Sequence, residues 1–152
     1  MNIELNAEQQ RVVNIGKELA QDFATRAADH DRDRSAPEEN YKKLQESGLF
    51  GIAIPKEYGG LGVGFLGYSA FVIELAQGCA STANSYNMHA NATGTIMQHP
   101  DIPESTKKKV AKLAIEEGKL MCTSVSEPNS SSLLASAYTP SLEARKVEGG
   151  YT

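Results

Sequence analysis

The sequence predicts a mainly α-helical fold, an orthogonal bundle of about five helices followed by a short β segment that begins a second domain. Apolar residues recur at helical spacing through the first part of the chain. From Leu120 onward the pattern changes to extended segments and turns. Gly149 and Gly150 give a hairpin signal, but few residues follow them, and a lone hairpin is marginally stable. We therefore expect residues 1–119 to form the helical domain and residues 120–152 to be the incomplete start of a truncated β domain.

Size, charge and hydropathy exclude several classes of protein. With 152 residues, the chain is long enough to bury a core of its own. Its net charge is −4 and its basic residues are scattered, so we expect no nucleic-acid partner. No apolar run approaches the roughly 18 residues of a membrane span, and the N-terminus lacks the basic and apolar blocks of a signal peptide. These features predict a cytoplasmic protein.

The first helix is predicted over residues 7–28. Asn6 and Gln9 have the spacing of a capping box. Apolar residues then recur on one helical face, at Val12, Ile15, Leu19 and Phe23. The mixed-charge stretch at residues 30–34 is expected to be a solvated link after the helix.

A second helix and a buried connector are predicted next. Pro37 suits the first turn of a helix, which Gly48 ends. The apolar run at residues 49–55 is too short and too closely bounded by Gly and Pro for another helix, so we expect a buried connector. The glycine-rich turn at residues 56–62 matches neither dinucleotide-binding nor P-loop spacing. Its glycines instead indicate positive φ angles or a close approach of the backbone.

Three more helices complete the predicted bundle. The third covers residues 65–77 and carries a single charge, which indicates burial on most sides. The fourth begins at a cap on Ser81 and runs to about Met97. The fifth begins near Pro103 and ends at Gly118. Its outer face is expected to carry a solvated basic cluster that could also help to bind an anion, formed by Lys107, Lys108, Lys109 and Lys112.

The fourth helix has small or polar residues almost throughout, so it leaves room beside it. Five residues follow helical spacing and could line a cavity for an elongated ligand: Tyr86, His89, Ala90, Thr93 and Met97. The alternative is close helix packing around small residues, with His89 a satisfied core or surface imidazole. Cys79 and Cys122 lack metal-ligand spacing and are expected to be buried free thiols.

The stretch from Met121 to Ser132 is the strongest candidate for a binding site. A short strand is predicted to lead into a turn that Pro128 stiffens. Hydroxyl groups are dense in this stretch and suit a polar, flat or phosphorylated ligand; they belong to Thr123, Ser124, Ser126, Ser130, Ser131 and Ser132. The alternative is a solvated serine-rich turn.

Two motifs carry a resemblance to the acyl-CoA dehydrogenase family. Residues 49–62, Leu-Phe-Gly-Ile-Ala-Ile-Pro-Lys-Glu-Tyr-Gly-Gly-Leu-Gly, closely match that family's Gly-Leu-x-Gly-(three residues)-Pro-Glu-x-Gly-Gly-x-Gly run. Residues 125–128, Val-Ser-Glu-Pro, match its Thr/Ser-Glu-Pro motif. Together with Leu-Asn-Ala-Glu-Gln near the start, the likeness spans nearly the whole chain. It is specific to the superfamily but not to one substrate.

The resemblance implies an FAD-dependent oxidoreductase of fatty acid metabolism, which oxidises an acyl-CoA thioester to its 2-enoyl form. It implies a helical N-terminal domain, a middle β domain and a C-terminal helical bundle around the flavin. The family's catalytic carboxylate lies in that bundle, so we assign no catalytic base here and expect this chain to be incompetent alone. The electron acceptor would be an electron-transfer flavoprotein or oxygen, and the full-length protein would be a homo-oligomer, a tetramer or a dimer.

The resemblance also implies roles for particular residues. The segment from Thr123 to Ser132 would run along the flavin, where hydrogen-bond donors stabilise the charge on the reduced ring. The implied cofactor-binding residues are Thr123, Ser124, Val125, Ser126 and Ser131. The implied substrate-binding residues are Tyr86, His89 and Thr93 along the acyl tunnel and Ser132 at the CoA portion.

One departure from the family pattern leaves two alternatives open. Where the family usually has Gly-Ser-Asp, this chain has Ser131-Ser132-Leu133, so either the flavin loop is rearranged or the ligands differ. This loss, together with His89 on the fourth helix, also agrees with a flavin-dependent monooxygenase of the same superfamily, acting on aromatic or heterocyclic substrates. The other alternative is a non-catalytic helical binding module.

Overall fold

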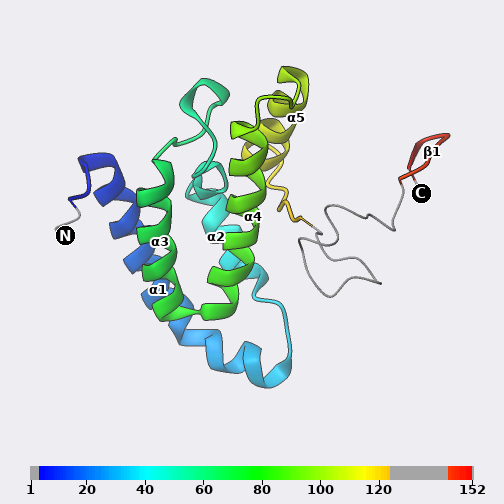
Figure 1. Cartoon of the computed structure of the whole chain (residues 1–152). Helices are drawn as coiled ribbons and strands as arrows, with labels where there is room; N and C mark the ends of the chain where they lie inside the picture. The colour runs from blue at the N-terminus through cyan, green and yellow to red at the C-terminus, as the bar shows by residue number, and fades with distance from the viewer. Residues whose placement is uncertain (1–3, 124–143, 152) are drawn as a thin grey trace, which may run out of the picture. The chain divides into compact units, whose positions relative to one another are not determined.

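Helices dominate the part of the chain that the structure describes, residues 4–123 and 144–151 of a computed structural model (Figure 1). Its α-helices are α1 (Ala7–Asp33), α2 (Glu38–Glu46), α3 (Gly64–Gly78), α4 (Ala80–Gln98) and α5 (Glu104–Ile115). Two 3-10 turns, η1 (Leu49–Gly51) and η2 (Lys56–Tyr58), lie between α2 and α3. The strands β1 (Lys146–Val147) and β2 (Gly150–Tyr151) form an antiparallel hairpin. The predicted fold class, mainly α with a short β segment, is confirmed.

The chain divides into two compact units, Met1–Cys122 and Thr123–Thr152. The first contains all the described helices. The second contains the predicted hairpin, in which Gly149 takes a φ of +83°. The assignment of this second unit to a middle β domain stays a prediction. No helix in the described ranges is long and apolar enough to cross a membrane.

The first helix begins as predicted and ends later than predicted. The Asn6 side chain accepts a hydrogen bond from the Gln9 N–H at 2.9 Å, and the Gln9 side chain accepts one from the Asn6 N–H at 3.0 Å. The helix does not stop near residue 28, however, because no Gly or Pro lies between that residue and Pro37. Arg32 forms ion pairs with neighbouring carboxylates of the same helix, and the mixed charges support a solvated last turn instead of a link.

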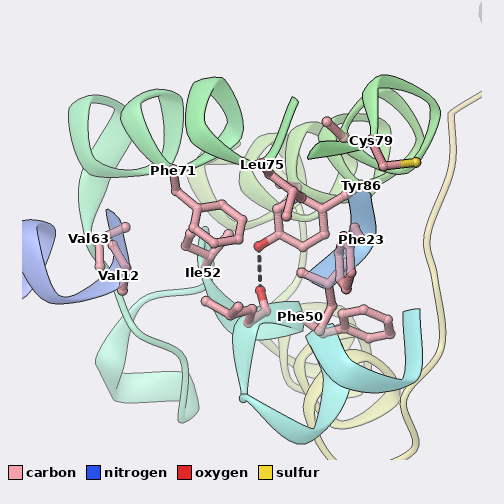
Figure 2. Packing of buried hydrophobic residues seen from close by; sticks show 13 residues of the cluster. Val12, Phe23, Phe50, Ile52, Val63, Phe71, Leu75, Cys79 and Tyr86 are labelled. Atoms are coloured by element: carbon pink, nitrogen blue, oxygen red, sulfur yellow. Dashed lines mark hydrogen bonds between the residues drawn. The ribbon is translucent and has the colours of Figure 1, made fainter. Parts of the chain in front are cut away.

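The main core lies between α1, α3, α4 and the connector (Figure 2). Close approach of α1 and α3 requires Gly78, since a Cβ there would lie 1.9 Å from the Ala20 carbonyl oxygen. The predicted connector at residues 49–55 is buried at most positions, as expected. The core cluster consists of Val12, Phe23, Leu44, Leu49, Phe50, Ile52, Val63, Phe71, Leu75, Cys79, Ala83, Tyr86 and Ala90.

The glycine-rich turn has the backbone geometry that its composition predicted. Gly59 and Gly62 take positive φ angles of 85° and 57°. A Cβ on Gly60 would lie 2.1 Å from the Ile54 carbonyl oxygen, so only glycine fits there. The turn therefore holds the connector closely folded on itself, ahead of α3.

Two predicted details of the later helices are wrong. The N-cap of α4 is Cys79, not Ser81, because one extended residue after Gly78 is enough to start the new helix. Lys107 does not face water: it is largely buried, and its ammonium group lies 3.8 Å from Glu104. It lies one helical turn before Val110, on the inward face of α5, where its aliphatic stem can pack.

Candidate functional site

A cavity of about 230 Å3 lies between α3 and α4. The two helices run in opposite directions from the short turn that joins them at Cys79 (Figure 1), and the cavity lies toward their other ends. The room that the sequence predicted beside the fourth helix is therefore present. Its lining residues are Ala53, Gly64, Phe65, Tyr68, Ala90, Asn91, Gly94, Thr95 and Gln98.

Small residues of α4 create this space. Ala90 and Gly94 are buried, and neither has a side chain that reaches across to α3. A Cβ on Gly94 would lie 3.4 Å from the Cβ of Ala53, which is ordinary contact, so the glycine adds free volume without being required by the backbone. At these two positions, α4 therefore has no large side chain on the cavity side.

Aromatic residues of α3 form the opposite wall. The rings of Phe65 and Tyr68 lie 6.2 Å apart, centroid to centroid, in an edge-on arrangement. The Tyr68 hydroxyl donates a hydrogen bond to the Asn87 side chain on α4. Burial raises the pKa of Tyr68, so the phenol stays protonated and neutral at physiological pH. The cavity can therefore receive a small, uncharged group between an aromatic wall and α4.

The substrate-binding residues expected on α4 lie in the core and do not line this cavity. Tyr86 is fully buried and its hydroxyl donates to the Leu49 carbonyl oxygen at 2.6 Å (Figure 2). Burial raises its pKa well above the usual value. Thr93 is also fully buried and donates back to the carbonyl oxygens of His89 and Ala90. Each of these side chains thus has a structural role here, and their contact with substrate stays a prediction.

His89 is a satisfied core imidazole, as the alternative interpretation proposed. The backbone N–H of Met121 donates to its Nδ1 atom at 3.0 Å, so Nδ1 is unprotonated. The proton must then be on Nε2, which lies 2.9 Å from the Phe50 carbonyl oxygen and donates to it. Burial lowers the pKa of this ring. The neutral imidazole ties the chain after α5 to the connector and to α4.

The predicted cofactor-binding segment falls mostly outside the described residues. Thr123 is described and is exposed. The others that were assigned to the flavin or to CoA lie outside the described ranges: Ser124, Val125, Ser126, Ser131 and Ser132. Their roles stay predictions. Cys122 is exposed, which corrects the expectation that both thiols are buried, while Cys79 is buried.

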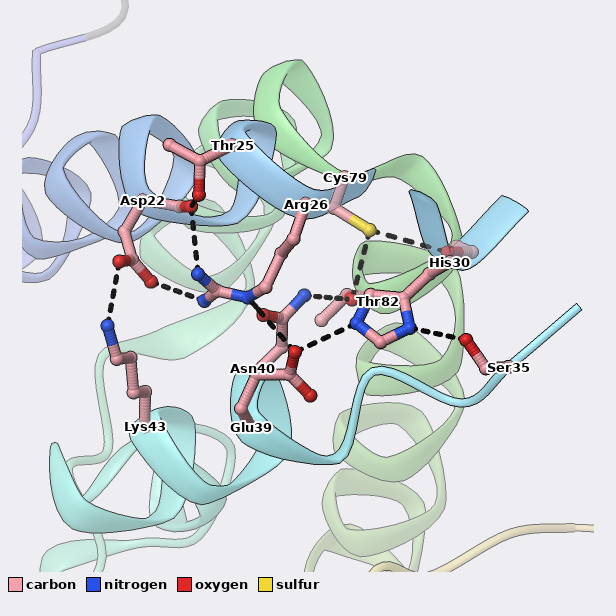
Figure 3. Close-up of polar contacts among 11 residues, drawn as sticks. Asp22, Thr25, Arg26, His30, Ser35, Glu39, Asn40, Lys43, Cys79 and Thr82 are labelled. Carbon is pink, nitrogen blue, oxygen red and sulfur yellow. Dashed lines mark hydrogen bonds and ion pairs between the residues drawn. The ribbon is translucent and has the colours of Figure 1, made fainter. Parts of the chain in front are cut away.

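A polar cluster that the sequence did not reveal joins α1, α2 and α4 (Figure 3). Arg26 Nε donates to the Asn40 side-chain oxygen at 2.7 Å, and Asn40 donates in turn to the Thr82 hydroxyl at 2.9 Å. Asp22 pairs with Arg26 and, at 2.7 Å, with Lys43. The Arg26 hydrogen bond, followed by that of Lys43, lowers the pKa of Asp22 to about 2. Each buried polar side-chain atom of the cluster has a hydrogen-bond partner within the protein, so the role of the cluster is to hold the three helices together.

The Cys79 thiol lies at the end of the same cluster. The Thr82 hydroxyl donates to its sulfur at 3.1 Å, and the Ser81 hydroxyl lies 3.3 Å from it. Burial acts to raise the pKa of the thiol, but these hydrogen bonds outweigh burial and the pKa is lowered. In the part of the chain that the structure describes, no group of His, Cys, Asp and Glu residues could hold a metal ion. The cluster therefore gives no metal centre.

Comparison with known proteins identifies the helical unit. Residues 6–117 match the family described as the N-terminal domain of acyl-CoA dehydrogenases. This chain belongs to the acyl-CoA dehydrogenase family. The match covers all of the described helices and the cavity between α3 and α4.

Relatives in the family support this assignment. The acryloyl-CoA reductase (NADH) of Anaerotignum propionicum is 31% identical over 133 residues, which is 87% of this chain and 33% of the relative. A short-chain specific acyl-CoA dehydrogenase of Clostridium acetobutylicum is 32% identical over 130 residues, or 85% of this chain and 34% of the relative. The chain thus spans about a third of the length of these two relatives.

A solved structure supports the fold. Nitrososynthase from Micromonospora carbonacea var. africana matches with a TM-score of 0.65 and 23% identity, over 76% of this chain and 32% of that protein. At this identity, the similarity shows the fold alone. It agrees with the helical domain of the acyl-CoA dehydrogenase family.

Of the α4 residues that line the cavity, sequence reasoning named Ala90 and missed the polar ones, although a signal for them exists. Asn91, Thr95 and Gln98 recur at helical spacing and share one polar face. This face lies beside the one that carries Tyr86 and the other predicted residues. Periodicity alone indicates both faces and does not say which one borders an open space.

Proposed function

We propose that this chain is the N-terminal part of an FAD-dependent oxidoreductase that dehydrogenates the α,β bond of an acyl-CoA thioester. The observation that carries the proposal is the family match over residues 6–117. The names of two relatives, acryloyl-CoA reductase and short-chain specific acyl-CoA dehydrogenase, support a small acyl group as the substrate. We expect that group to enter the cavity between α3 and α4, whose volume of about 230 Å3 suits a small ligand.

The segment that begins at Thr123 is proposed to hold FAD. Its hydroxyl and backbone N–H donors fit a flavin, whose ring carbonyls and unprotonated nitrogens accept hydrogen bonds. When bound, FAD supplies the acceptor for the hydride that leaves the substrate. The proposed cofactor ligands are Thr123, Ser124, Val125, Ser126 and Ser131, and Ser132 is proposed to contact CoA.

The base that removes the α-proton is proposed to lie outside residues 1–152. Relatives are about three times as long as this chain, which leaves most of such an enzyme to other residues. The chain alone is therefore not expected to be catalytically competent. An electron-transfer flavoprotein or molecular oxygen is the proposed electron acceptor, and the full-length protein is proposed to be a homo-oligomer, a tetramer or a dimer.

Flavin reduction in the full-length protein tests this proposal. The purified protein should be yellow, and anaerobic addition of butanoyl-CoA should bleach the flavin absorbance because the substrate transfers hydride to the ring. Coenzyme A without an acyl group should leave the spectrum unreduced. A colourless full-length protein, or a flavin that acyl-CoA thioesters do not reduce, would contradict the proposal.

A second candidate is a flavin-dependent monooxygenase of the same superfamily. The replacement of Gly-Ser-Asp by Ser131-Ser132-Leu133 favours it. His89 no longer does, because both of its ring nitrogens are engaged in the core. Substrate-dependent oxygen uptake by the reduced flavoprotein, with no response to acyl-CoA, would support this candidate. A full-length protein that binds no flavin would instead leave a non-catalytic helical binding module.

A further inference from the structure

The α4 wall of the cavity is polar but uncharged. Asn91, Thr95 and Gln98 supply side-chain amide and hydroxyl groups. No Asp, Glu, Lys or Arg is among the lining residues in the described ranges. The wall can therefore donate and accept hydrogen bonds but offers no counter-charge to an ion.

These polar groups form a row along α4. Asn91, Thr95 and Gln98 are four and three residues apart, so they lie one helical turn after another on the same face. Ala90 and Gly94 beside them are buried and leave the space in front of the row open. The three side chains of the row are themselves exposed, so the row borders the open side of the cavity and faces water instead of a packed neighbour.

The row has unused hydrogen-bonding capacity. Within residues 4–123 and 144–151, the side chains of Asn91, Thr95 and Gln98 make no hydrogen bond. The Tyr68 hydroxyl across the cavity is already taken, since it donates to Asn87. A ligand that enters the cavity must therefore satisfy the row itself or remove water from it.

We propose that the enzyme prefers acyl-CoA thioesters whose acyl chain carries a neutral hydrogen-bonding group, such as a hydroxyl, over acyl chains made of hydrocarbon alone. This inference rests on the proposed function and names its substrate class. A hydrocarbon chain would displace water from the side-chain amides and leave these groups without a hydrogen-bond partner. Binding of such a chain is therefore disfavoured relative to binding of a chain with a polar group. A charged group would lose its hydration without gaining a counter-ion.

Matched pairs of thioesters test the inference on the full-length flavoprotein. Pentanoyl-CoA and 4-hydroxybutanoyl-CoA differ by a methyl against a hydroxyl group, and heptanoyl-CoA and 6-hydroxyhexanoyl-CoA repeat the comparison at greater depth. In at least one pair, kcat/KM should be roughly threefold to tenfold higher for the hydroxylated member. This ratio corresponds to the net free energy of one hydrogen bond. Flavin bleaching by butanoyl-CoA serves as the reference reaction.

Variants locate the preference in the α4 row. Asn91→Leu and Thr95→Val each remove polar atoms from the cavity and should bring the ratio of kcat/KM values within the preferred pair to about one or below. Asn14→Leu is the control, because it makes the same Asn-to-Leu change on the exposed face of α1. It should leave the ratio of kcat/KM values as in the wild type. Unchanged thermal unfolding midpoints would show that the variants are folded.

The outcomes separate this inference from the proposed function. If butanoyl-CoA bleaches the flavin but neither pair shows a hydroxyl preference, the inference fails and the proposed function stands. The same holds if both cavity variants keep the preference of the wild type. If neither butanoyl-CoA nor any probe bleaches the flavin, both fail together.

Discussion

The protonation of His89 is fixed by two backbone groups. Because the Met121 N–H points at Nδ1, adding a proton to that atom would set two donors against each other. Burial also disfavours the charged ring, and its pKa lies below the ordinary 6.5. The unfolded chain therefore takes up a proton at a higher pH than the folded chain does.

Stability should fall as the pH drops through the range just below 6.5. A lowered histidine pKa means that the unfolded state binds more protons in this window, so the free energy of unfolding decreases with decreasing pH. His89→Gln should lower that free energy at neutral pH by about 1–3 kcal/mol, since it disturbs two buried hydrogen bonds. It should also remove this part of the pH dependence. Urea unfolding of the chain on both sides of pH 6.5 measures both effects.

His99→Gln is the matched control. His99 is exposed, so its replacement should change the free energy of unfolding by no more than about 0.5 kcal/mol. A His89→Gln variant that keeps the full pH dependence of the wild type would show that the buried ring does not cause it.

At the scale of elements, glycine decides how closely the helices pack. Gly78 sits where α3 meets the backbone of α1, and its missing side chain is what lets the two approach. Gly94 on α4 faces the cavity, with only ordinary contact near it. The same residue type thus serves close packing in one helix and open space in the next.

Gly78→Ala and Gly94→Ala should have opposite effects on stability. The first places a Cβ 1.9 Å from the Ala20 carbonyl oxygen and forces α1 and α3 apart, so we expect a loss of about 1–3 kcal/mol. The second fits without displacing backbone and should be neutral or stabilise by up to about 1 kcal/mol through helix propensity. Urea denaturation followed by circular dichroism measures both. Equal losses in the two variants would contradict this account of the packing.

Local chemistry made several elements predictable. The Asn6 and Gln9 capping box is a short-range signal, and both of its hydrogen bonds form. The glycines at 59, 60 and 62 predicted positive φ or close approach because a residue without a Cβ tolerates both far more easily than other residues do. Features of this kind depend on neighbours in the sequence and can be read before any tertiary contact is known.

Features that depend on tertiary contact were not predictable. On α4, the face with Tyr86 and the face with Asn91 both show helical periodicity, and only the packing of the connector makes the first one core and the second one cavity. Lys107 was expected outside for its charge, but its place on the inward face of α5 outweighed that preference. The Arg26 and Asn40 pair joins separate helices and has no local pattern.

At the scale of the whole molecule, α3 presents an exposed apolar surface. Phe65 is 83% exposed and Ile73 is 62% exposed, and they lie eight residues apart on the same helix. Large apolar side chains grouped in this way favour association with another surface. Within the described ranges, no residue of this chain covers these two side chains.

The chain in isolation should therefore self-associate as its concentration rises. Ile73→Ser should weaken the association severalfold, because it removes apolar area from the α3 surface without touching the core. Val147→Ser changes an exposed apolar residue of β1 instead of α3; it is the control and should have little effect. Sedimentation velocity over a range of concentrations distinguishes the two. A wild-type chain that remains monomeric at every concentration would contradict the prediction.

The bond between Met121 and His89 has a consequence for how the chain opens. Met121 follows the last helix and belongs to no helix or strand, yet its amide hydrogen is held by a ring that water does not reach. Exchange of that hydrogen with solvent then requires the segment that holds Met121 to leave the ring. The amide of an irregular residue should thus exchange more slowly than those of the exposed residues beside it, and the chain leaves the bundle from a fixed point.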